Sequence, residues 1–413
     1  MGCCDTPGLL PLDQALSKML DSIEIINKTQ TLALEDAAGY VLASDILSPI
    51  FVPPFDNSAM DGYAVRQADL ESNTSLKQIG KSFAGQPFDG EYEVNSCVRI
   101  MTGAQIPAGY DLVIMQEQTQ VNGDEVDFSA ALPVQLGQNI RPRGDDIVEG
   151  ALVLEKGHRL TPRDIPMIAS LGIAQVKVYT KPKVAFFSTG DELKPLGTKL
   201  AAGEIYDSNR YGIAVLIEKF GCEPVDLGVI PDCKDKLRQA FIDAKNQADV
   251  VVTSGGVSVG EADYTKEILD ELGEIGFWKL AIKPGKPFAF GKLGDALFCG
   301  LPGNPVSAMM TLYVLVQPLL AKLSGHTQWQ APVMIPAQTT TKLKKVPGRT
   351  DFQRGIYQLN EDGQFVVETT GNQSSGAFRS MSLANCFIVL ERERGHVKAG
   401  ERVMIQPFNH TLY

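Results

Sequence analysis

The most constraining feature of this sequence is the alternation of strand-like and helix-like stretches between residues 183 and 323. Short apolar runs at 184–188 and 249–254 are separated by stretches whose apolar residues recur at the spacing of one helix face. Such alternation predicts an α/β unit with a mostly parallel sheet and helices on both faces. Ligands of such sheets bind at the carboxyl ends of the strands, so a site is expected there.

The pattern of the chain changes on both sides of this α/β stretch. Residues 51–141 and 329–413 carry short strand patterns between turn signals. Because 413 residues are too many for one compact core, we predict a multidomain architecture of the α/β plus β class. Its expected parts are an N-terminal linker or dimer domain (8–50 and 142–180), a β-rich inserted domain (51–141), a central α/β domain (181–328) and a small C-terminal β-barrel (329–413).

The bulk composition argues against several classes of protein. A formal net charge of −11 disfavours binding to nucleic acid, and we interpret the cluster of Lys342, Lys344 and Lys345 as a solvated strand face. No apolar run approaches the roughly 20 residues of a membrane-spanning helix, so no membrane contact is expected. The seven cysteines are scattered and form no Cys-x-x-Cys pair, which fits a reducing cytoplasm rather than a disulfide or zinc framework.

Glycine and acidic residues occur together at several predicted strand ends. The loops in question span residues 189–192, 230–232, 254–263 and 300–307. Glycine lets backbone N–H groups approach an oxyanion closely, and a helix start adds aligned donors. The sequence has neither a P-loop nor a dinucleotide fingerprint, so these loops predict a phosphate or tetrahedral oxyanion site of another kind. The substrate-binding candidates in the third loop are Ser254, Gly255, Gly256 and Ser258.

Three acids in these loops are candidate metal ligands. Glu192, Asp232 and Asp263 lie at different strand ends, which converge in a parallel sheet. Carboxylates beside bound phosphates would hold Mg²⁺, which would neutralise phosphate charge during hydrolysis. Asp232 and Asp263 also precede predicted helices, so they could instead be helix caps. Both interpretations stay open at the level of the sequence.

Two lysines form a candidate anion clamp. Lys279 and Lys283 lie in a stretch where strand periodicity would place both on one face. Two ammonium groups on one face suit a single bound anion. The alternative is a solvated strand edge, at which lysine and proline discourage further pairing.

Several segments together resemble one known family. They match the molybdopterin molybdenumtransferase family of the bacterial MoeA type, which is similar to the E domain of gephyrin. The resemblance runs from about residue 8 to the end of the chain. The segments that carry it are Phe-Asp-Asn-Ser-Ala-Met-Asp-Gly-Tyr-Ala-Val at 55–65, Arg-Ile-Met-Thr-Gly-Ala at 99–104, and the stretches 188–193, 253–265, 279–287 and 300–307.

The resemblance implies an elongated homodimer of four-domain subunits. The central α/β domain would bind molybdopterin, and the cleft would lie between this domain and the β-rich domain of the other subunit. Asp61 and Thr102 would therefore reach the site across the dimer, Asp61 in a catalytic role. Glu192, Asp232 and Asp263 correspond to family acids that handle the metal and the pterin nucleotide.

Further residues are assigned through the same resemblance. Asp146 corresponds to another functional acid, and Arg141 lies nearby. The residues at the positions of the family's molybdate contacts are Lys279, Lys283, Pro302, Ser307, Arg354 and Ser375.

The implied activity is the insertion of molybdate into adenylylated molybdopterin. The phosphoanhydride would be cleaved with Mg²⁺ bound, and AMP and molybdenum cofactor would be released. A separate molybdopterin adenylyltransferase would supply the substrate, and proteins that mature downstream molybdoenzymes would receive the product, all in the cytoplasm. The alternative is a non-enzymatic, gephyrin-like scaffold that binds a peptide at the dimer.

Overall fold

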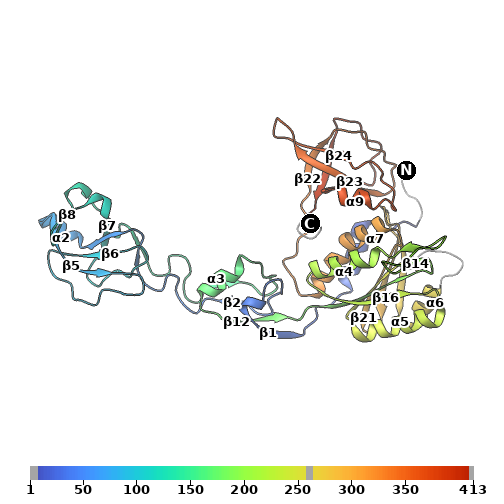
Figure 1. Cartoon of the computed structure of the whole chain (residues 1–413), viewed down its shortest axis with the longest axis horizontal. Helices are drawn as coiled ribbons and strands as arrows, with labels where there is room; N and C mark the ends of the chain where they lie inside the picture. Colours follow the sequence, from blue (N-terminus) through green and yellow to red (C-terminus); the bar gives the residue numbers. More distant parts are fainter. Residues whose placement is uncertain (1–7, 257–263, 409–413) are drawn as a thin grey trace.

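The computed structural model describes residues 8–256 and 264–408, which form an elongated molecule (Figure 1). The inserted β-rich part lies at one end, and the α/β domain and the C-terminal barrel lie together at the other (Figure 1). A small middle part connects them, and the chain passes through it twice. The structure therefore confirms the predicted multidomain α/β plus β class. Ser258 and Asp263 lie outside the described residues.

The α/β domain is built on one six-stranded mixed sheet. Four strands are parallel, and two antiparallel strands extend one edge. The strand order is β16 (Glu223–Ile230), β13 (Lys183–Thr189), β17 (Val250–Ser254), β21 (Ala296–Leu301), β20 (Pro287–Leu293) and β18 (Glu274–Lys279).

Both faces of this sheet are covered, because alternate residues of its strands are apolar on both sides. Phe186 and Val252 pack in a core with helix α4 (Asn209–Lys219) and the long helix that follows β21. Phe187 and Val251 pack on the opposite face with α5 (Lys234–Gln247) and α6 (Tyr264–Leu272). The predicted arrangement of helices on both faces is thus confirmed.

A long helix spans Pro305–Leu323 and follows strand β21. It consists of α7 (Pro305–Thr311), a π-helical segment (Leu312–Val316) and α8 (Gln317–Leu323). With 19 residues, this helix is long and apolar enough to cross a membrane, and it is the one such helix in the described part of the chain. However, 83% of its most apolar window is buried inside the protein, as in the core helix of a folded domain.

The C-terminal domain is a small closed barrel, as predicted. Five strands pair side by side, and the ring closes because the strands at the two ends of this order, β23 and β25, also pair with each other. In ring order they are β23 (Thr350–Leu359), β24 (Phe365–Thr369), β22 (Ile335–Thr339), β26 (Arg402–Pro407) and β25 (Cys386–Leu390). The short strand β19 (Ile282–Lys283) of the α/β part pairs in parallel with β23 and joins the two domains.

One expectation about the barrel is wrong. The lysine cluster was interpreted as a solvated strand face, but Lys345 is only 2% exposed. Its Nζ donates to the carbonyl oxygens of Val346, Arg349 and Arg392 at 3.0, 2.7 and 3.4 Å. The sequence pattern could not reveal these acceptors, because they are backbone carbonyls of two separate loops.

The inserted domain is a second six-stranded sheet. Its order is β7 (Leu112–Met115), β4 (Gly62–Val65), β6 (Ser96–Ile100), β5 (Ser75–Ser82), β9 (Glu125–Asp127) and β8 (Gln120–Asn122). Apolar clusters form on both of its faces, around Phe128 on one and Tyr110 on the other.

The middle part contains short paired strands and one helix. Strand β1 (Thr29–Ala33) pairs antiparallel with β12 (Gln175–Tyr179), and α3 (Asp164–Ser170) packs nearby. The first helix, α1 (Leu12–Asp21), buries Ala15 and Met19 in the core of the α/β domain, against α8. Residues 8–50 therefore divide their contacts between two parts of the molecule.

Candidate functional site

The carboxyl ends of the parallel strands open into one large cavity of about 1160 Å³. The loops after β13, β16, β17 and β21 line it, and the segments 283–287 and 373–375 close it on the barrel side. The convergence predicted from the sheet topology is therefore observed. The predicted site residues that line this cavity are Glu192, Asp232, Ser254, Gly255, Gly256, Lys283, Pro302, Ser307 and Ser375.

Glycine is required in the loop that follows β17. Gly255 and Gly256 have φ values of +96° and +68°, which residues with a Cβ rarely adopt. A Cβ on Gly255 would lie 3.0 Å from both the carbonyl oxygen and Oγ1 of Thr189, and one on Gly256 would lie 2.7 Å from Oγ1 of Thr265. The chain packs so closely here that its backbone, rather than side chains, faces the cavity.

Asn209 ties two of these loops together. Its Nδ2 donates to Oγ of Ser254 and to the carbonyl oxygen of Gly303, both at 2.8 Å. The loops after β17 and β21 are therefore fixed relative to each other at the start of α4. Asn209 lines the cavity, and the sequence analysis missed it because it lies at a helix start without a recognised motif.

The acids of the cavity interact with one another. Partial burial raises the pKa of Asp232, and the negative charges of Asp191 and Glu192 raise it further. The amide of Asp232 donates to Oδ1 of Asp191 at 3.1 Å. Cys233 is the N-cap of α5 and no side chain caps this helix, so the capping interpretation of Asp232 does not apply. For Asp263 both interpretations stay open, since it lies outside the described residues.

The acidic side chains of the cavity fit an Mg²⁺ ion that is coordinated partly by the protein and partly by a bound phosphate ligand. Among residues 8–256 and 264–408, no three His, Cys, Asp or Glu side chains are grouped closely enough to form a complete metal site. Mg²⁺ in phosphate sites is commonly bound by one or two carboxylates together with the phosphates and water. Glu192 and Asp232, which both line the cavity, match that arrangement.

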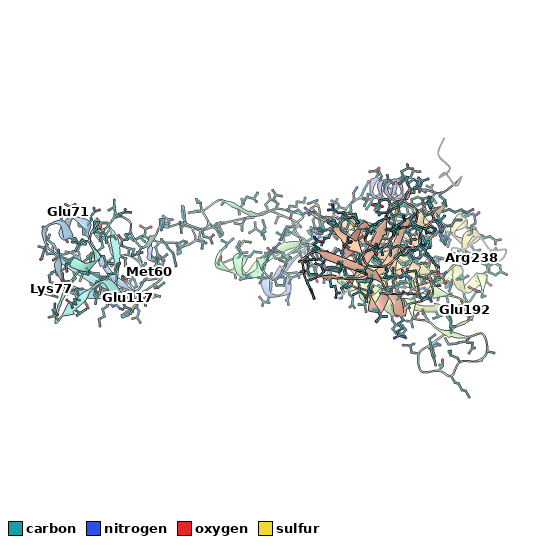
Figure 2. The ribbon with its side chains drawn as sticks, turned by 90° about the horizontal axis from the view of Figure 1, so that it is seen from above. Met60, Glu71, Lys77, Glu117, Glu192 and Arg238 are labelled. Atoms are coloured by element: carbon teal, nitrogen blue, oxygen red, sulfur yellow. The ribbon has the colours of Figure 1, made fainter. Side chains whose placement is uncertain are left out.

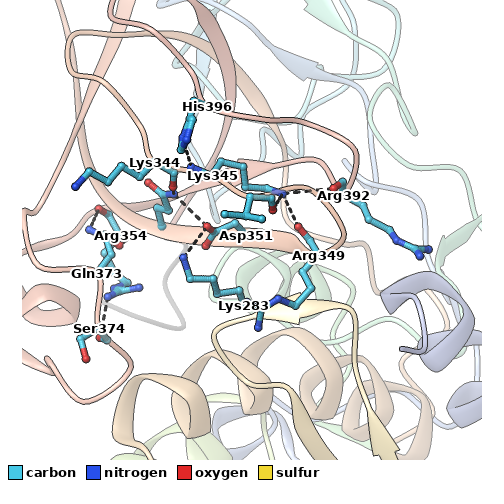
Figure 3. A network of polar contacts seen from close by, with 12 residues as sticks. Lys283, Lys344, Lys345, Arg349, Asp351, Arg354, Gln373, Ser374, Arg392 and His396 are labelled. Carbon is cyan, nitrogen blue, oxygen red and sulfur yellow. Dashed lines mark hydrogen bonds and ion pairs between the residues drawn. The ribbon is translucent and has the colours of Figure 1, made fainter. Parts of the chain in front are cut away.

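Cations line the barrel side of the cavity. Lys283 lies on β19, and its Nζ is 3.2 Å from Oδ2 of the buried Asp351 in the barrel (Figure 3). Lys286 and Arg349 also line the cavity, and neither was predicted. Lys279 ends β18 as an exposed residue and is not part of the lining. The strand-period argument for the lysine pair was wrong, because the chain leaves the large sheet after Lys279 and Lys283 pairs with the barrel.

Arg354 supports the wall of the cavity from behind. It is 1% exposed, and it is absent from the cavity lining. Its Nε donates to Oγ of Ser380 at 3.0 Å, and its Nη2 donates to the carbonyl oxygen of Ser374 at 3.0 Å. The next residue, Ser375, lines the cavity and accepts a hydrogen bond on its carbonyl oxygen from the amide of Val306 at 3.1 Å.

Comparison with known proteins identifies the family. The family models "MoeA N-terminal region (domain I and II)", "Probable molybdopterin binding domain" and "MoeA C-terminal region (domain IV)" match residues 10–172, 185–322 and 336–408. A molybdopterin molybdenumtransferase of Haemophilus influenzae is 56% identical over 404 residues, which cover 98% of this chain and 100% of that protein. The chain belongs to the molybdopterin molybdenumtransferase family.

Other relatives agree with this assignment. A molybdopterin molybdenumtransferase of a Nostoc species is 32% identical over 97% of this chain and 93% of its own length. Gephyrin of Dictyostelium discoideum is 32% identical over 98% of this chain, which spans 63% of that longer protein. The crystal structure of a molybdopterin biosynthesis MoeA protein of Pyrococcus horikoshii superposes with a TM-score of 0.84 at 31% identity, covering 97% of this chain and 100% of that one.

In this member of the molybdopterin molybdenumtransferase family, the inserted domain lies far from the cavity of its own chain. Oδ1 of Asp61 accepts hydrogen bonds from the amide and Oγ1 of Thr102, both at 2.8 Å, and these bonds lower the pKa of Asp61. Met60 and Glu117 mark this domain at one end of the molecule, and Glu192 lies at the other (Figure 2). Asp61 and Thr102 thus meet each other, but they do not meet Glu192.

Arg141 and Asp146 occupy the connection between the inserted and middle parts. Arg141 belongs to β10 (Ile140–Arg141), which pairs with β3 (Asn57–Ser58). The amide of Asp146 donates to the carbonyl oxygen of Val52 at 3.0 Å, and the residue is exposed. Neither residue lines the cavity of its own chain.

Proposed function

We propose that this chain inserts molybdate into adenylylated molybdopterin, cleaving the phosphoanhydride and releasing AMP and molybdenum cofactor. The observation that carries the proposal is the division of charge in one cavity. Glu192 and Asp232 lie in the strand-end loops, whereas Lys283, Lys286 and Arg349 lie on the barrel side. Such a cavity offers separate places for a metal-bound pyrophosphate and for a second oxyanion.

The strand-end loops are proposed to bind the pyrophosphate. Gly255 and Gly256 bring the backbone close to the ligand, and Ser254 is held in place by Asn209. Glu192 and Asp232, with Asp263 from the segment outside the described residues, are proposed to hold Mg²⁺. When bound, Mg²⁺ would neutralise charge on the phosphates and assist the departure of AMP. The carboxylates also orient the attacking water.

The barrel side is proposed to bind molybdate. Lys283, Ser307 and Ser375 supply polar groups from three different segments, and Pro302 shapes the wall between them. Arg354 acts by holding the loop that carries Ser375. The dithiolene sulfurs of the pterin, rather than protein cysteines, become ligands of molybdenum. A role for Lys279 in this clamp stays a prediction.

A second copy of the chain is proposed to complete the site. Asp61 and Thr102 lie in the inserted domain, at the opposite end of the molecule from Glu192 (Figure 2). In a symmetric dimer each inserted domain can serve the cavity of its partner. Arg141 and Asp146, at the base of the inserted domain, are proposed to face the same shared cleft.

The proposed setting is cytoplasmic. Cys97, Cys222, Cys233, Cys299 and Cys386 are all free thiols in the described part of the chain. A molybdopterin adenylyltransferase is proposed to supply the substrate, and maturation proteins of molybdoenzymes are proposed to take the product. Membrane and nucleic acid are not proposed as partners.

One incubation tests the proposed reaction. The purified protein is mixed with adenylylated molybdopterin, Mg²⁺ and molybdate, and AMP and molybdenum cofactor are measured together. We expect equal amounts of both products and a strong dependence on molybdate. Glu192→Gln should block the reaction, whereas Glu361→Gln in an exposed turn of the barrel should not.

Two results would contradict the proposal. AMP release without incorporated molybdenum would indicate a simple phosphoanhydride hydrolase. If a folded dimer with added substrates forms no AMP and no molybdenum cofactor, that result would favour the gephyrin-like scaffold.

A further inference from the structure

We propose that Arg99 is a positioning residue for the cleft shared by two copies of the chain. It fixes the two segments that flank Asp61, so that the inserted domain presents this carboxylate to the partner's cavity in one orientation. The proposal rests on the proposed function, in which each inserted domain serves the cavity of the other subunit. The sequence analysis assigned a role to Thr102 of the segment 99–104 but none to Arg99.

Asp61 is held from two sides of one strand. It directly precedes β4, which lies between β7 and β6 in the inserted sheet. The loop after β6 supplies the amide and Oγ1 of Thr102, which both donate to Oδ1 of Asp61 at 2.8 Å. The segment after β7 supplies the amide of Gln116, which donates to the carbonyl oxygen of Asp61 at 3.1 Å. The orientation of the carboxylate therefore depends on segments from both neighbours of β4.

Arg99 connects these segments across β4. It lies on β6 opposite Tyr63 of β4, and its Cζ lies over the ring of Tyr63, 4.9 Å from the ring centroid. Nη1 donates to the carbonyl oxygen of Gly62 at 2.9 Å, and Nη2 donates to Oε1 of Gln116. One guanidinium thus joins β6, the residue after Asp61 and the segment after β7. The planar fork of arginine suits such a double contact, whereas lysine offers a single nitrogen.

The two acceptors of Arg99 are themselves held in place. Nε2 of Gln116 donates to Oε1 of Glu117 at 3.0 Å, so the amide group of Gln116 presents its oxygen to Arg99. A Cβ on Gly62 would lie 1.9 Å from the carbonyl oxygen of Ile114, so β4 and β7 approach closely beside Asp61. Arg99 is therefore anchored on both sides of the residue that it positions.

The electrostatics suit a carboxylate that stays ionised. The hydrogen bonds from Thr102 lower the pKa of Asp61, and the positive charge of Arg99 lowers it further. Both acceptors of Arg99 are uncharged groups, so the guanidinium keeps its positive charge beside Asp61. Both bonds from Thr102 go to Oδ1 of the exposed Asp61, so Oδ2 can face a ligand in the partner's cavity.

A second arginine of the inserted sheet shows what is specific to Arg99. Arg66 follows β4 at its other end, and its Cζ lies over the ring of Tyr92, 5.4 Å from the centroid. Its Nη1 also donates to Oη of Tyr92 at 3.4 Å. These contacts lie at the end of β4 opposite Asp61. Contact with a tyrosine ring is thus shared by both arginines, and Arg99 differs by its contacts beside Asp61. Arg66 is therefore the matched control.

Hydrogen exchange tests whether Arg99 holds the two segments, and it needs no substrate. Amide exchange in the full-length protein is followed by mass spectrometry for wild type, Arg99→Gln and the control Arg66→Gln. We expect Arg99→Gln to speed exchange about tenfold in the segments 101–104 and 116–119, because the amides of Thr102 and Gln116 lose a fixed acceptor. The control should leave both segments unchanged. Unchanged exchange in Arg99→Gln would overturn the proposal.

Steady-state kinetics tests whether this placement matters for the reaction. We expect Arg99→Gln to lower kcat about ten- to hundredfold and to leave the KM for molybdate nearly unchanged, because the proposed molybdate contacts lie outside the inserted domain. Arg99→Lys keeps the charge but cannot span both acceptors, so its kcat should stay below that of wild type. Arg66→Gln should match wild type. Full activity in Arg99→Lys, or a raised KM with unchanged kcat in Arg99→Gln, would overturn the positioning role.

A second variant covers the case in which Arg99→Gln does not fold. Gln116→Met keeps the length of the side chain and removes the acceptor on the far side of β4. It should show the same faster exchange in the segment 101–104 and the same loss of kcat. Wild-type exchange and kcat in this variant would overturn the proposal.

Mixed dimers decide whether Arg99 acts through Asp61. Arg99→Gln is dissociated and reassociated with Glu192→Gln in one sample and with Asp61→Asn in another. With Glu192→Gln each mixed dimer should have one intact site, so activity should rise to about one quarter of wild type. With Asp61→Asn every site receives a damaged inserted domain, so no recovery is expected. Recovery with Asp61→Asn would overturn the proposal.

The same samples separate this proposal from the proposed function. Asp61→Asn mixed with Glu192→Gln is the reference pair. If the reference pair recovers and Arg99→Gln with Glu192→Gln does not, Arg99 does not serve the partner's cavity and the proposal fails. If wild type makes no molybdenum cofactor, the proposed function fails instead, and hydrogen exchange still decides whether Arg99 holds Asp61.

Discussion

Lys283 of the α/β domain places its Nζ 3.2 Å from Oδ2 of Asp351 in the barrel, and this ion pair joins the two walls of the cavity. Asp351 is 3% exposed, and Oδ2 also accepts from Nε2 of Gln353 at 3.1 Å. The pair continues a backbone connection, because Lys283 and Asp351 are opposite each other where β19 pairs with β23. The barrel is thus part of the site rather than an appendage to it.

This relationship predicts that Asp351→Asn destabilises the protein. The change removes negative charge from the neighbourhood of the buried cations Lys345 and Arg354, whose pKa values it helps to hold up. We expect a loss of about 1–3 kcal/mol in the free energy of unfolding, measured by urea denaturation. Asp362→Asn, in an exposed turn of the barrel, is the control. Equal stability of the Asp351 variant and wild type would show that the ion pair does not secure the barrel.

A second prediction concerns Asp232 and pH. Burial and the charges of Asp191 and Glu192 raise its pKa above the ordinary value of 3.8, so the folded protein holds this proton more tightly than the unfolded chain does. The free energy of unfolding therefore falls as the pH rises from 3.8 through the raised pKa of Asp232, because the folded protein must then hold an unfavourable ionised carboxylate.

Asp232→Asn should accordingly unfold at a slightly higher temperature than wild type at pH 7, in the absence of metal. Below pH 3.8 both states of wild type are protonated, and the advantage should vanish. The same variant should lose AMP release. Differential scanning calorimetry across pH checks the first part, and an advantage that grew toward acidic pH would refute the explanation.

A third prediction separates backbone strain from function. Gly256→Ala should lose about 1–2 kcal/mol of stability from its left-handed backbone conformation, and it should also lose activity because the new Cβ meets Thr265 at 2.7 Å. Gly363→Ala is the matched control, since its φ is +74° and nothing lies within 4 Å of the added Cβ. It should lose similar stability and keep full activity. Comparable activity in the two variants would remove the Gly256 loop from the site.

The parts of the site that follow from topology could be predicted from the sequence. Strand ends of a parallel sheet converge, so glycines and acids that follow successive strands must meet. Glu192, Asp232 and Gly255 were found in this way, and all three line one cavity. The helices on both faces of the sheet followed from apolar periodicity in the same manner. The run of short strands indicated a small β-rich C-terminal domain, but its closure into a ring depends on the β23–β25 pairing.

The cations could not be placed by the same reasoning. Strand periodicity put Lys279 and Lys283 on one face, but it applies only while the chain stays in one sheet. Nothing in the sequence separates Arg354, which is buried behind the wall, from Arg349, which faces the cavity. The direction of an arginine depends on which carbonyls surround it, and those come from distant segments.

The central claim is that the reaction takes place in a cleft shared by two copies of the chain. Asp61→Asn and Glu192→Gln variants are each expected to be inactive, and they are mixed after dissociation and allowed to reassociate. If the inserted domain serves its partner's cavity, each mixed dimer has one intact site, so activity should recover to about one quarter of wild type for random pairing in a symmetric dimer. Activity that stays at the level of the separate variants would contradict the claim, because every site would then carry one of the two lesions.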